Sequence, residues 1–170
     1  VRSTDNGSSF DNVTSPTGNN LLGVTFDNDI FVAVGQTGNI VRSTDNGSSF
    51  DNATSTTGKN LWGIKFGNDI FVAVGKSGNI IRSTDNGSSF DNVTSPTGND
   101  LLEVTFGNDI FVAVGNSGNI LRSTDNGSTF DNATSPTGKN LFGVTFGNDI
   151  FLGVGQSGNI LRSTDNGSSF

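Results

Sequence analysis

The amino-acid sequence predicts an all-β protein, a β-propeller built from 40-residue, four-stranded blades. The prediction rests first on a fixed period: residues 1–40, 41–80, 81–120 and 121–160 align without a gap, and residues 161–170 begin a fifth copy. Each copy contains short apolar runs separated by turn residues, and none has helical spacing of useful length. Four antiparallel strands in roughly 40–45 residues form a propeller blade. A ring also removes the exposed end sheets that a linear stack would leave.

The first two strands of a blade are predicted at residues 21–26 and 30–34. The first segment has apolar residues at alternate positions, which is typical of a strand. Residues 27–29 supply turn chemistry. The second segment is a continuous apolar run, as expected where both faces of a strand are buried.

The third and fourth strands are predicted at residues 39–44 and 48–54. Between them, Asp45-Asn46-Gly47 predicts a tight turn, because an Asn-Gly pair accepts the positive φ angles of hairpin turns. Applied to every repeat, this pattern predicts one propeller domain or propeller half over residues 1–170. Its blades cover residues 21–55, 61–95 and 101–135, with a closing blade made of residues 141–165 and 1–15.

The closing blade leaves about ten residues redundant and allows more than one assembly. The same ends can close across two chains by strand exchange, which would give an eight-bladed homodimer, the assembly we favour. A four-bladed monomer ranks second, followed by a fragment of a longer ring or a fibre.

Composition excludes several partners. The net charge is −7 and the nine Lys and Arg residues are spread along the chain, so there is no basic patch for nucleic acid or an anionic membrane. Cysteine and histidine are absent, and no apolar run has membrane-spanning length. We predict neither a cofactor nor a metal, and the sequence does not define a compartment.

A recurrent motif follows each predicted third strand. The segment Ser3-Thr4-Asp5-Asn6-Gly7-Ser8-Ser9-Phe10 resembles the Asp box, S-x-D-x-G-x-[ST]-[WF], of sialidases and related propellers. The preceding Gly-Asn-Ile-x-Arg-Ser and the Val-Ala-Val-Gly run resemble the photosystem II assembly-factor type of Asp-box propeller. The resemblance implies a fold and not an activity, because Asp boxes occur in propellers with different roles.

We interpret the motif as a structural turn lock. The carboxylate of Asp5 can accept backbone N–H groups, Gly7 supplies the left-handed conformation, and Phe10 is expected to anchor the outgoing strand in the core. A metal-binding or catalytic role for the Asp is the less favoured interpretation. The full set of residues assigned to the lock is Ser3, Asp5, Gly7, Phe10, Asp45, Asp85, Asp125 and Asp165.

The sequence argues against an enzyme. A sialidase needs a Tyr nucleophile with an acidic helper and an arginine cluster that grips the substrate carboxylate. This chain has no Tyr, its only Glu is Glu103, and each repeat has a single Arg. Without His or Cys, the usual nucleophile–base pairs are also missing.

The candidate ligand-binding residues are those at which the repeats differ. The differences gather at repeat positions 16, 19, 20, 22, 23, 25 and 36, which a four-stranded blade places mostly in loops on one face. Amides, lysines and aromatics there would suit a glycan or a peptide, whereas drift at tolerant positions is the alternative. The candidates are Asn19, Asn20, Gln36, Lys59, Trp62, Lys76, Asp100, Asn116, Lys139, Phe142 and Gln156. We therefore predict a non-catalytic binding or scaffold module; the alternative is a purely structural, self-assembling repeat protein with no ligand.

Overall fold

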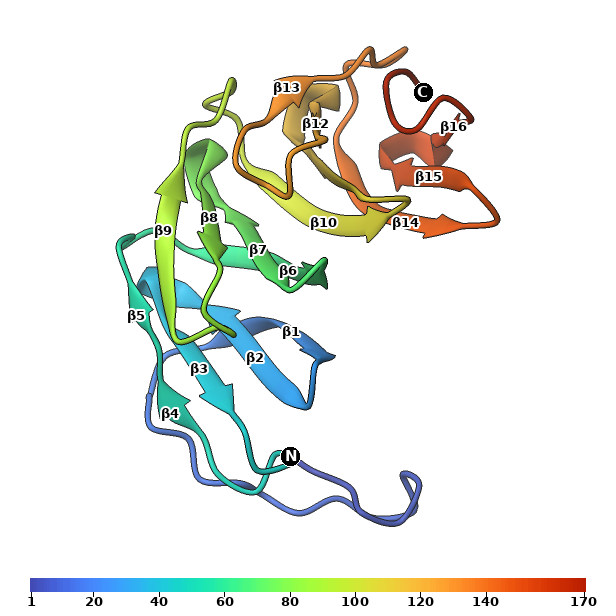
Figure 1. Cartoon of the computed structure of the whole chain (residues 1–170). Helices are drawn as coiled ribbons and strands as arrows, with labels where there is room; N and C mark the ends of the chain where they lie inside the picture. The colour runs from blue at the N-terminus through green and yellow to red at the C-terminus, as the bar shows by residue number, and fades with distance from the viewer.

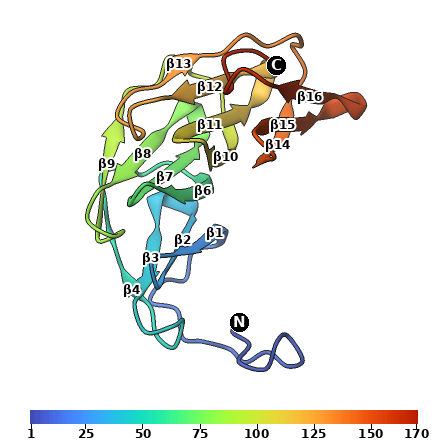
Figure 2. The ribbon, with the colours of Figure 1, turned by 45° about the vertical axis from the view of Figure 1, so that its right-hand side comes forward.

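The computed structural model describes residues 1–170 and contains four sheets at the 40-residue spacing of the repeats, the first of them over residues 21–52. Within each blade, consecutive strands pair antiparallel. The four sheets follow one another around an arc, with the first strand of each on the concave side and the last strand outside (Figure 1). The two termini lie at opposite ends of the arc (Figure 2). The all-β, propeller-type fold predicted from the sequence is confirmed.

The inner half of each blade is a hairpin. Its turn is formed by two residues with positive φ, such as Asn28 (51°) and Asp29 (59°), which matches the twist of the strands. A β-bulge interrupts the register near the start of each first strand, as between Leu21 and Gly23. The first strands are β1 (Leu21–Asp27), β6 (Leu61–Gly67), β10 (Leu101–Gly107) and β14 (Leu141–Gly147). The second strands are β2 (Ile30–Gly35), β7 (Ile70–Gly75), β11 (Ile110–Gly115) and β15 (Ile150–Gly155).

A 3₁₀ turn connects the second strand to the third. The turns are η1 (Gln36–Gly38), η2 (Lys76–Gly78), η3 (Asn116–Gly118) and η4 (Gln156–Gly158). The third strands are β3 (Ile40–Ser43), β8 (Ile80–Ser83), β12 (Ile120–Ser123) and β16 (Ile160–Ser163). None of the helical turns has the length and apolar character needed to cross a membrane.

The outer strands are shorter than predicted. They are β4 (Asp51–Asn52), β9 (Ser89–Val93) and β13 (Asp131–Asn132). The tight turn predicted at Asp45-Asn46-Gly47 is present: Asn46 and Gly47 have positive φ, and the Ser48 N–H donates to the carbonyl of Asp45 at 3.3 Å. The flanking strands are shorter than predicted, so the whole connection in the first blade covers residues 44–50. The carboxylate of Asp45 organises this longer loop, as described below.

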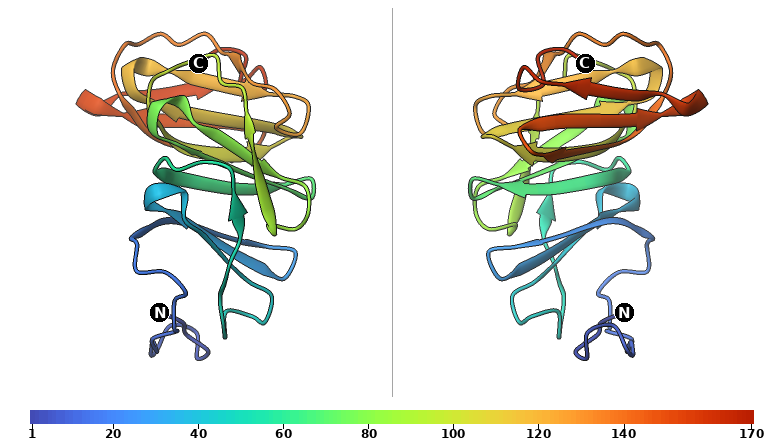
Figure 3. Two further views of the ribbon diagram at one scale, coloured as in Figure 1. Left: turned by 90° about the vertical axis from the view of Figure 1, so that its left-hand side faces the viewer. Right: turned by 90° about the vertical axis from the view of Figure 1, so that its right-hand side faces the viewer.

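An unexpected strand links two blades. The short β5 (Thr54–Ser55) leaves the first blade and pairs in parallel with β9, the outer strand of the second. Thr134 makes the same kind of bridge to Ser169. The outer edge of one blade therefore continues into the edge of the next, as the left view of Figure 3 shows for β5 and β9.

The hydrophobic core lies between blades. In the first junction, Ile30, Val32, Val34 and Ile40 of one blade pack against residues of the next blade, among them Leu61 and Phe71. The second and third junctions repeat this arrangement with the equivalent residues. Each sheet thus buries its apolar faces only against its neighbours.

The predicted closing blade is not assembled within this chain. Strands β14, β15 and β16 form a three-stranded sheet, whereas at the other end of the arc Arg2 pairs with Asp11 beside the first blade. Four blades of this curvature span only part of a turn, so residues 1–15 lie far from residues 141–165 (Figure 1). A closing blade that uses both segments stays a prediction for an assembly of chains.

Candidate functional site

The Asp-box turns are hydrogen-bonded within themselves. The hydroxyl of Ser3 and the N–H of Ser9 donate to Asp5 Oδ1 at 2.8 and 2.9 Å, and the Ser9 hydroxyl donates to Oδ2 at 2.6 Å. The N–H of Gly7, which has a φ of 81°, donates to Ser3 Oγ at 2.9 Å. Equivalent bonds surround Asp45, Asp85, Asp125 and Asp165.

These bonds change the acidity of the carboxyl groups. The hydroxyl and N–H of Ser9, together with the hydroxyl of Ser3, lower the pKa of Asp5 to about 2. The pKa values of Asp45 and Asp165 are also lowered, first of all by the hydroxyls of Ser49 and Ser169. At neutral pH these groups are ionised and their oxygens are already engaged in stabilising the turn.

Phe10 does not anchor a core in this chain. It is 62% exposed, whereas the equivalent Phe90 and Phe130 are 1% and 4% exposed. Phe90 belongs to a complete blade that packs on a preceding one, and the segment containing Phe10 has no inner strands beside it. The expectation for Phe10 was therefore wrong, because the contact depends on a neighbouring blade.

One candidate ligand position instead joins consecutive blades. Asp100 Oδ1 accepts the N–H of Ser77 in the preceding blade at 2.8 Å. Asn60 and Asn140 make the same bond to the preceding blade at 3.0 Å. Asn20 occupies this position in the first repeat, where no blade precedes it.

The remaining loop candidates lie at the same end of the blades, which we call the loop face. Some contact one another: Asn19 Nδ2 donates to Thr37 Oγ1, and Asn116 Nδ2 donates to Asp100 Oδ2. Gln36 is half-buried, and its N–H donates to the carbonyl of Asn20. The exposed loop candidates are Asn19, Asn20, Lys59, Lys76, Lys139 and Gln156.

Lys59 lines a polar groove on the loop face. The groove has a volume of about 520 Å³, and Ser77, Asn79 and Thr97 also line it. The Oδ1 atom of Asn79 is buried and has no hydrogen-bond partner. A buried amide oxygen without a partner favours a ligand or water that can donate to it.

The inner wall is the concave surface formed by β1, β6, β10 and β14. Trp62 is half-buried on β6, and Phe142 is 56% exposed on β14. A Cβ atom placed on Gly63, next to Trp62, would lie 3.0 Å from Glu103 Oε1 of β10. The lone Trp and the lone Glu of the chain therefore lie in adjacent stretches of two neighbouring strands.

Glu103 is held in a partly buried position. Burial raises its pKa above the ordinary value, while the Val104 N–H, which donates to Oε1 at 3.0 Å, and the positive charge of Lys65 act in the opposite direction. We define Trp62, Lys65 and Glu103 as the inner-wall patch. It combines an apolar ring, an ammonium group and a carboxylate.

Lys65 and Glu103 were missing from the residues selected from the sequence. Both stand at positions where the repeats differ, which was the available signal. That signal could not show that β6 lies beside β10, which is what brings the two side chains near each other.

The fold class is that of β-propellers. No protein-family model matches the chain, and no curated protein sequence matches it significantly. Solved structures do: YCF48 from Cyanidioschyzon merolae has a TM-score of 0.71 at 19% identity, over 92% of this chain and 56% of that one. A structure described as YCF48 bound to D1 peptide has a TM-score of 0.71 at 17% identity, over 91% and 53%. This chain thus spans about half the length of both.

A designed protein has the same TM-score against this chain. The computationally designed Ika4 protein has a TM-score of 0.71 at 14% identity, and the match covers 91% of this chain and 98% of that one. At these identities the similarity establishes the fold alone.

Proposed function

We propose that the protein is a non-catalytic propeller module that binds an extended polypeptide along its inner wall. The observation that carries this proposal is the inner-wall patch. In repeats that are otherwise nearly identical, the one Trp, the one Glu and the one Lys within a first strand converge on β6 and β10. Divergence of this kind supports a role that the common scaffold does not need.

The chemistry of the patch suits a peptide. An aromatic ring offers a large contact area to an apolar side chain at a low cost in conformational entropy. The Glu103 carboxylate and the Lys65 ammonium group, which lie on these same two strands, β10 and β6, can pair with backbone amides and carbonyls or with side chains of opposite charge. One structural neighbour is described as bound to a peptide, which supports this class of ligand.

The repeats supply a matched variant for the test. Leu, Thr and Gly stand in sister repeats at the positions of Trp62, Lys65 and Glu103, so the triple variant W62L/K65T/E103G should fold normally. We expect peptides selected from a random library on the wild type to shift Trp62 fluorescence. Calorimetry should show that the triple variant binds them about tenfold or more weakly.

The control is Lys76→Asn, which introduces the residue of the third repeat on the loop face. It should keep full peptide affinity. Equal binding by the triple variant, at an unchanged melting temperature, would refute the proposed site.

A glycan is the second candidate, favoured by the polar groove beside Lys59. Hydroxyl groups of a sugar could donate to Asn79 Oδ1, which has no partner. On a glycan array we expect any signal to fall in Lys59→Asn and to persist in W62L/K65T/E103G. The absence of signal on every glycan would remove this candidate.

The third candidate is structural: two chains close into an eight-bladed ring, with or without a ligand. The observation in its favour is that both ends of the arc leave apolar residues exposed, among them Val24 and Ile160. We expect native mass spectrometry to give the mass of two chains. The mass of one chain at micromolar concentration would exclude the ring, and a ladder of larger masses would indicate a filament instead.

A further inference from the structure

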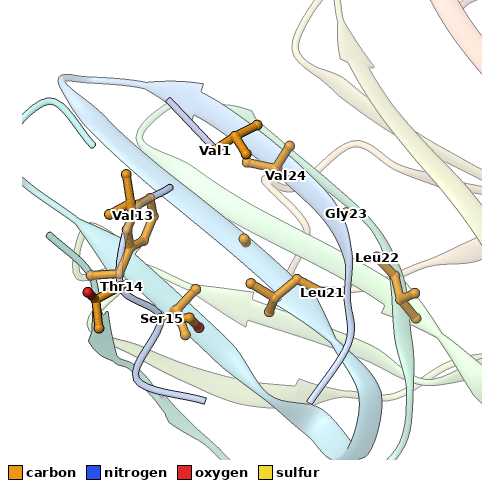
Figure 4. Close-up of a pocket in the computed structure, with 11 residues that line it drawn as sticks. Val1, Val13, Thr14, Ser15, Leu21, Leu22, Gly23 and Val24 are labelled. Atoms are coloured by element: carbon orange, nitrogen blue, oxygen red, sulfur yellow. The ribbon is translucent and has the colours of Figure 1, made fainter. Parts of the chain in front are cut away.

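The first blade has an uncovered apolar face. Leu21 and Val24 are 40% and 67% exposed, whereas their equivalents Leu61 and Ile64 are 0% and 5% exposed. They line a groove of about 360 Å³ that also includes Val41 and is visible in Figure 4. In the second, third and fourth blades this face is covered by the preceding blade.

The last blade has the complementary uncovered face. Leu152, Val154 and Ile160 are 36%, 42% and 70% exposed. Their equivalents in the other blades are at most 2% exposed, because the following blade covers them. The two ends of the arc are therefore the two halves of a fourth junction, and a second copy of this chain carries the half that each end lacks.

The N-terminal segment already occupies part of this junction. Arg2 Nε donates to the carbonyl of Asn46 at 2.9 Å. Arg42, Arg82 and Arg122 make the same bond to the residue 44 positions ahead, at 2.6 to 2.7 Å. The backbone pair of Arg2 with Asp11 likewise repeats that of Arg42 with Asp51. Residues 1–11 thus lie where the outer hairpin of a preceding blade would lie.

We propose that residues 1–10 are a placeholder, displaced from the first blade by residues 161–170 of a second copy when the ring closes. This inference rests on the proposed ring and adds how its junction is made. The two segments differ only in their first residue, so the exchange replaces each polar contact by an identical one. Burial of the two apolar faces then drives the exchange.

Residues 161–170 are held more firmly in their own chain than residues 1–10. Strand β16 pairs with β15 over four residue pairs, Leu161 is only 7% exposed, and Phe170 packs on the third core cluster. On the N-terminal side, Val1 is 86% exposed. Residues 161–170 are therefore integrated into their blade, whereas residues 1–10 rest on few contacts.

Closure of the ring would supply acceptors for three hydrogen-bond donors at the open face of the last blade. The equivalent donors in the other blades already have such acceptors. The Ser157 N–H would meet the second chain's Asn20, as Ser117 meets Asn140. The Asn148 side chain would meet the second chain's Asn46, as Asn108 meets Asn166. Arg162 would replace Arg2 on the carbonyl of that same Asn46.

Two matched variants test the placeholder. Arg2→Ala weakens the placeholder alone, and Arg162→Ala weakens the displacing segment alone, although the two arginines occupy the same repeat position. A hydrogen bond of this kind changes affinity about threefold, and the ring contains two such junctions. By analytical ultracentrifugation we expect the Kd of the dimer to fall about tenfold in Arg2→Ala and to rise about tenfold in Arg162→Ala.

The alternatives give different results. If residues 1–10 stayed in place and joined the partner's β15, Arg2 would keep its bond to Asn46 and Arg162 would gain none. Neither substitution would then change the Kd, and this result would overturn the placeholder while the ring stands. If neither the wild type nor Arg2→Ala dimerises, the ring and the placeholder both fail. Circular dichroism of each variant checks that the fold is retained.

Discussion

Ile80 and Ile160 occupy the same repeat position but different environments. Ile80, in the junction between the second and third blades, is fully buried, whereas Ile160, on the last blade, is 70% exposed. At the other end, Val24 is 67% exposed and Val104 is 2% exposed. The comparison teaches that a blade has no core of its own: the same residue is core or surface according to whether a neighbouring blade covers it.

The largest expected difference in the free energy of unfolding lies between alanine substitutions of these two isoleucines. Ile80→Ala leaves a cavity in a filled junction and should lower the free energy of unfolding by about 3 kcal/mol. Ile160→Ala, at an open face, should change the stability of the single chain by less than about 0.5 kcal/mol. Urea denaturation followed by Trp62 fluorescence, at a concentration where the chain is monomeric, measures both. Similar losses in the two variants would show that the end face is already covered.

A smaller difference in the free energy of unfolding is expected between alanine substitutions of two glycines. Gly78 (φ 69°) faces the next blade, and a Cβ there would collide with the carbonyl oxygen of Thr97. Gly158 (φ 72°) faces open space. Gly158→Ala should lower the free energy of unfolding by about 1 kcal/mol, because alanine disfavours the left-handed conformation. Gly78→Ala should lower it by roughly twice that or more, because the added Cβ also collides with the loop. Thermal unfolding measures the difference; equal costs would mean that the inter-blade loop moves aside freely.

The smallest expected effect is on thermal stability at acid pH, where the Asp boxes of Asp85 and Asp5 should behave differently. In the folded chain the pKa of Asp85 is lowered below its ordinary value of 3.8: burial alone would raise it, but hydrogen bonds from Ser89 and Ser83 outweigh that effect. A lowered carboxyl pKa stabilises the fold above about pH 4, and this contribution is lost as the pH falls further. The melting temperature of the wild type should therefore fall below about pH 4.

Asp85→Asn should reduce this dependence on pH, because it removes the titrating group from an interior blade. Asp5→Asn is the control, since Asp5 lies in the segment outside the four sheets and should leave the acid transition unchanged. Equal effects of the two substitutions would show that residues 1–10 contribute to the cooperative unit.

The sequence was sufficient to predict the propeller fold. Turn residues at a constant spacing and apolar runs of strand length define the hairpins locally, so no distant contact is needed to recognise them. The turn at Asn46-Gly47 was predicted correctly, but the ends of its strands were not. The Asp45 carboxylate accepts hydrogen bonds from Ser48 and Ser49, and these bonds keep the residues after the turn in a loop.

The candidate site was predicted less completely. The varied loop residues do lie at one end of the blades, but Asp100 serves a bond between blades. Glu103 and Lys65 were overlooked because their proximity depends on how two first strands lie next to each other. The sequence of a single repeat does not show which residues of β6 lie next to which residues of β10.

The sequence by itself determined the repeat, the strands and the chemistry of each turn, because these depend on residues close together along the chain. Only the tertiary structure decided which apolar faces are covered, which segment occupies the edge of the first blade, and which side chains meet on the inner wall. The physical reason is that nearly identical repeats have the same local preferences, so burial and partners are set by the order of the blades and by where the arc ends.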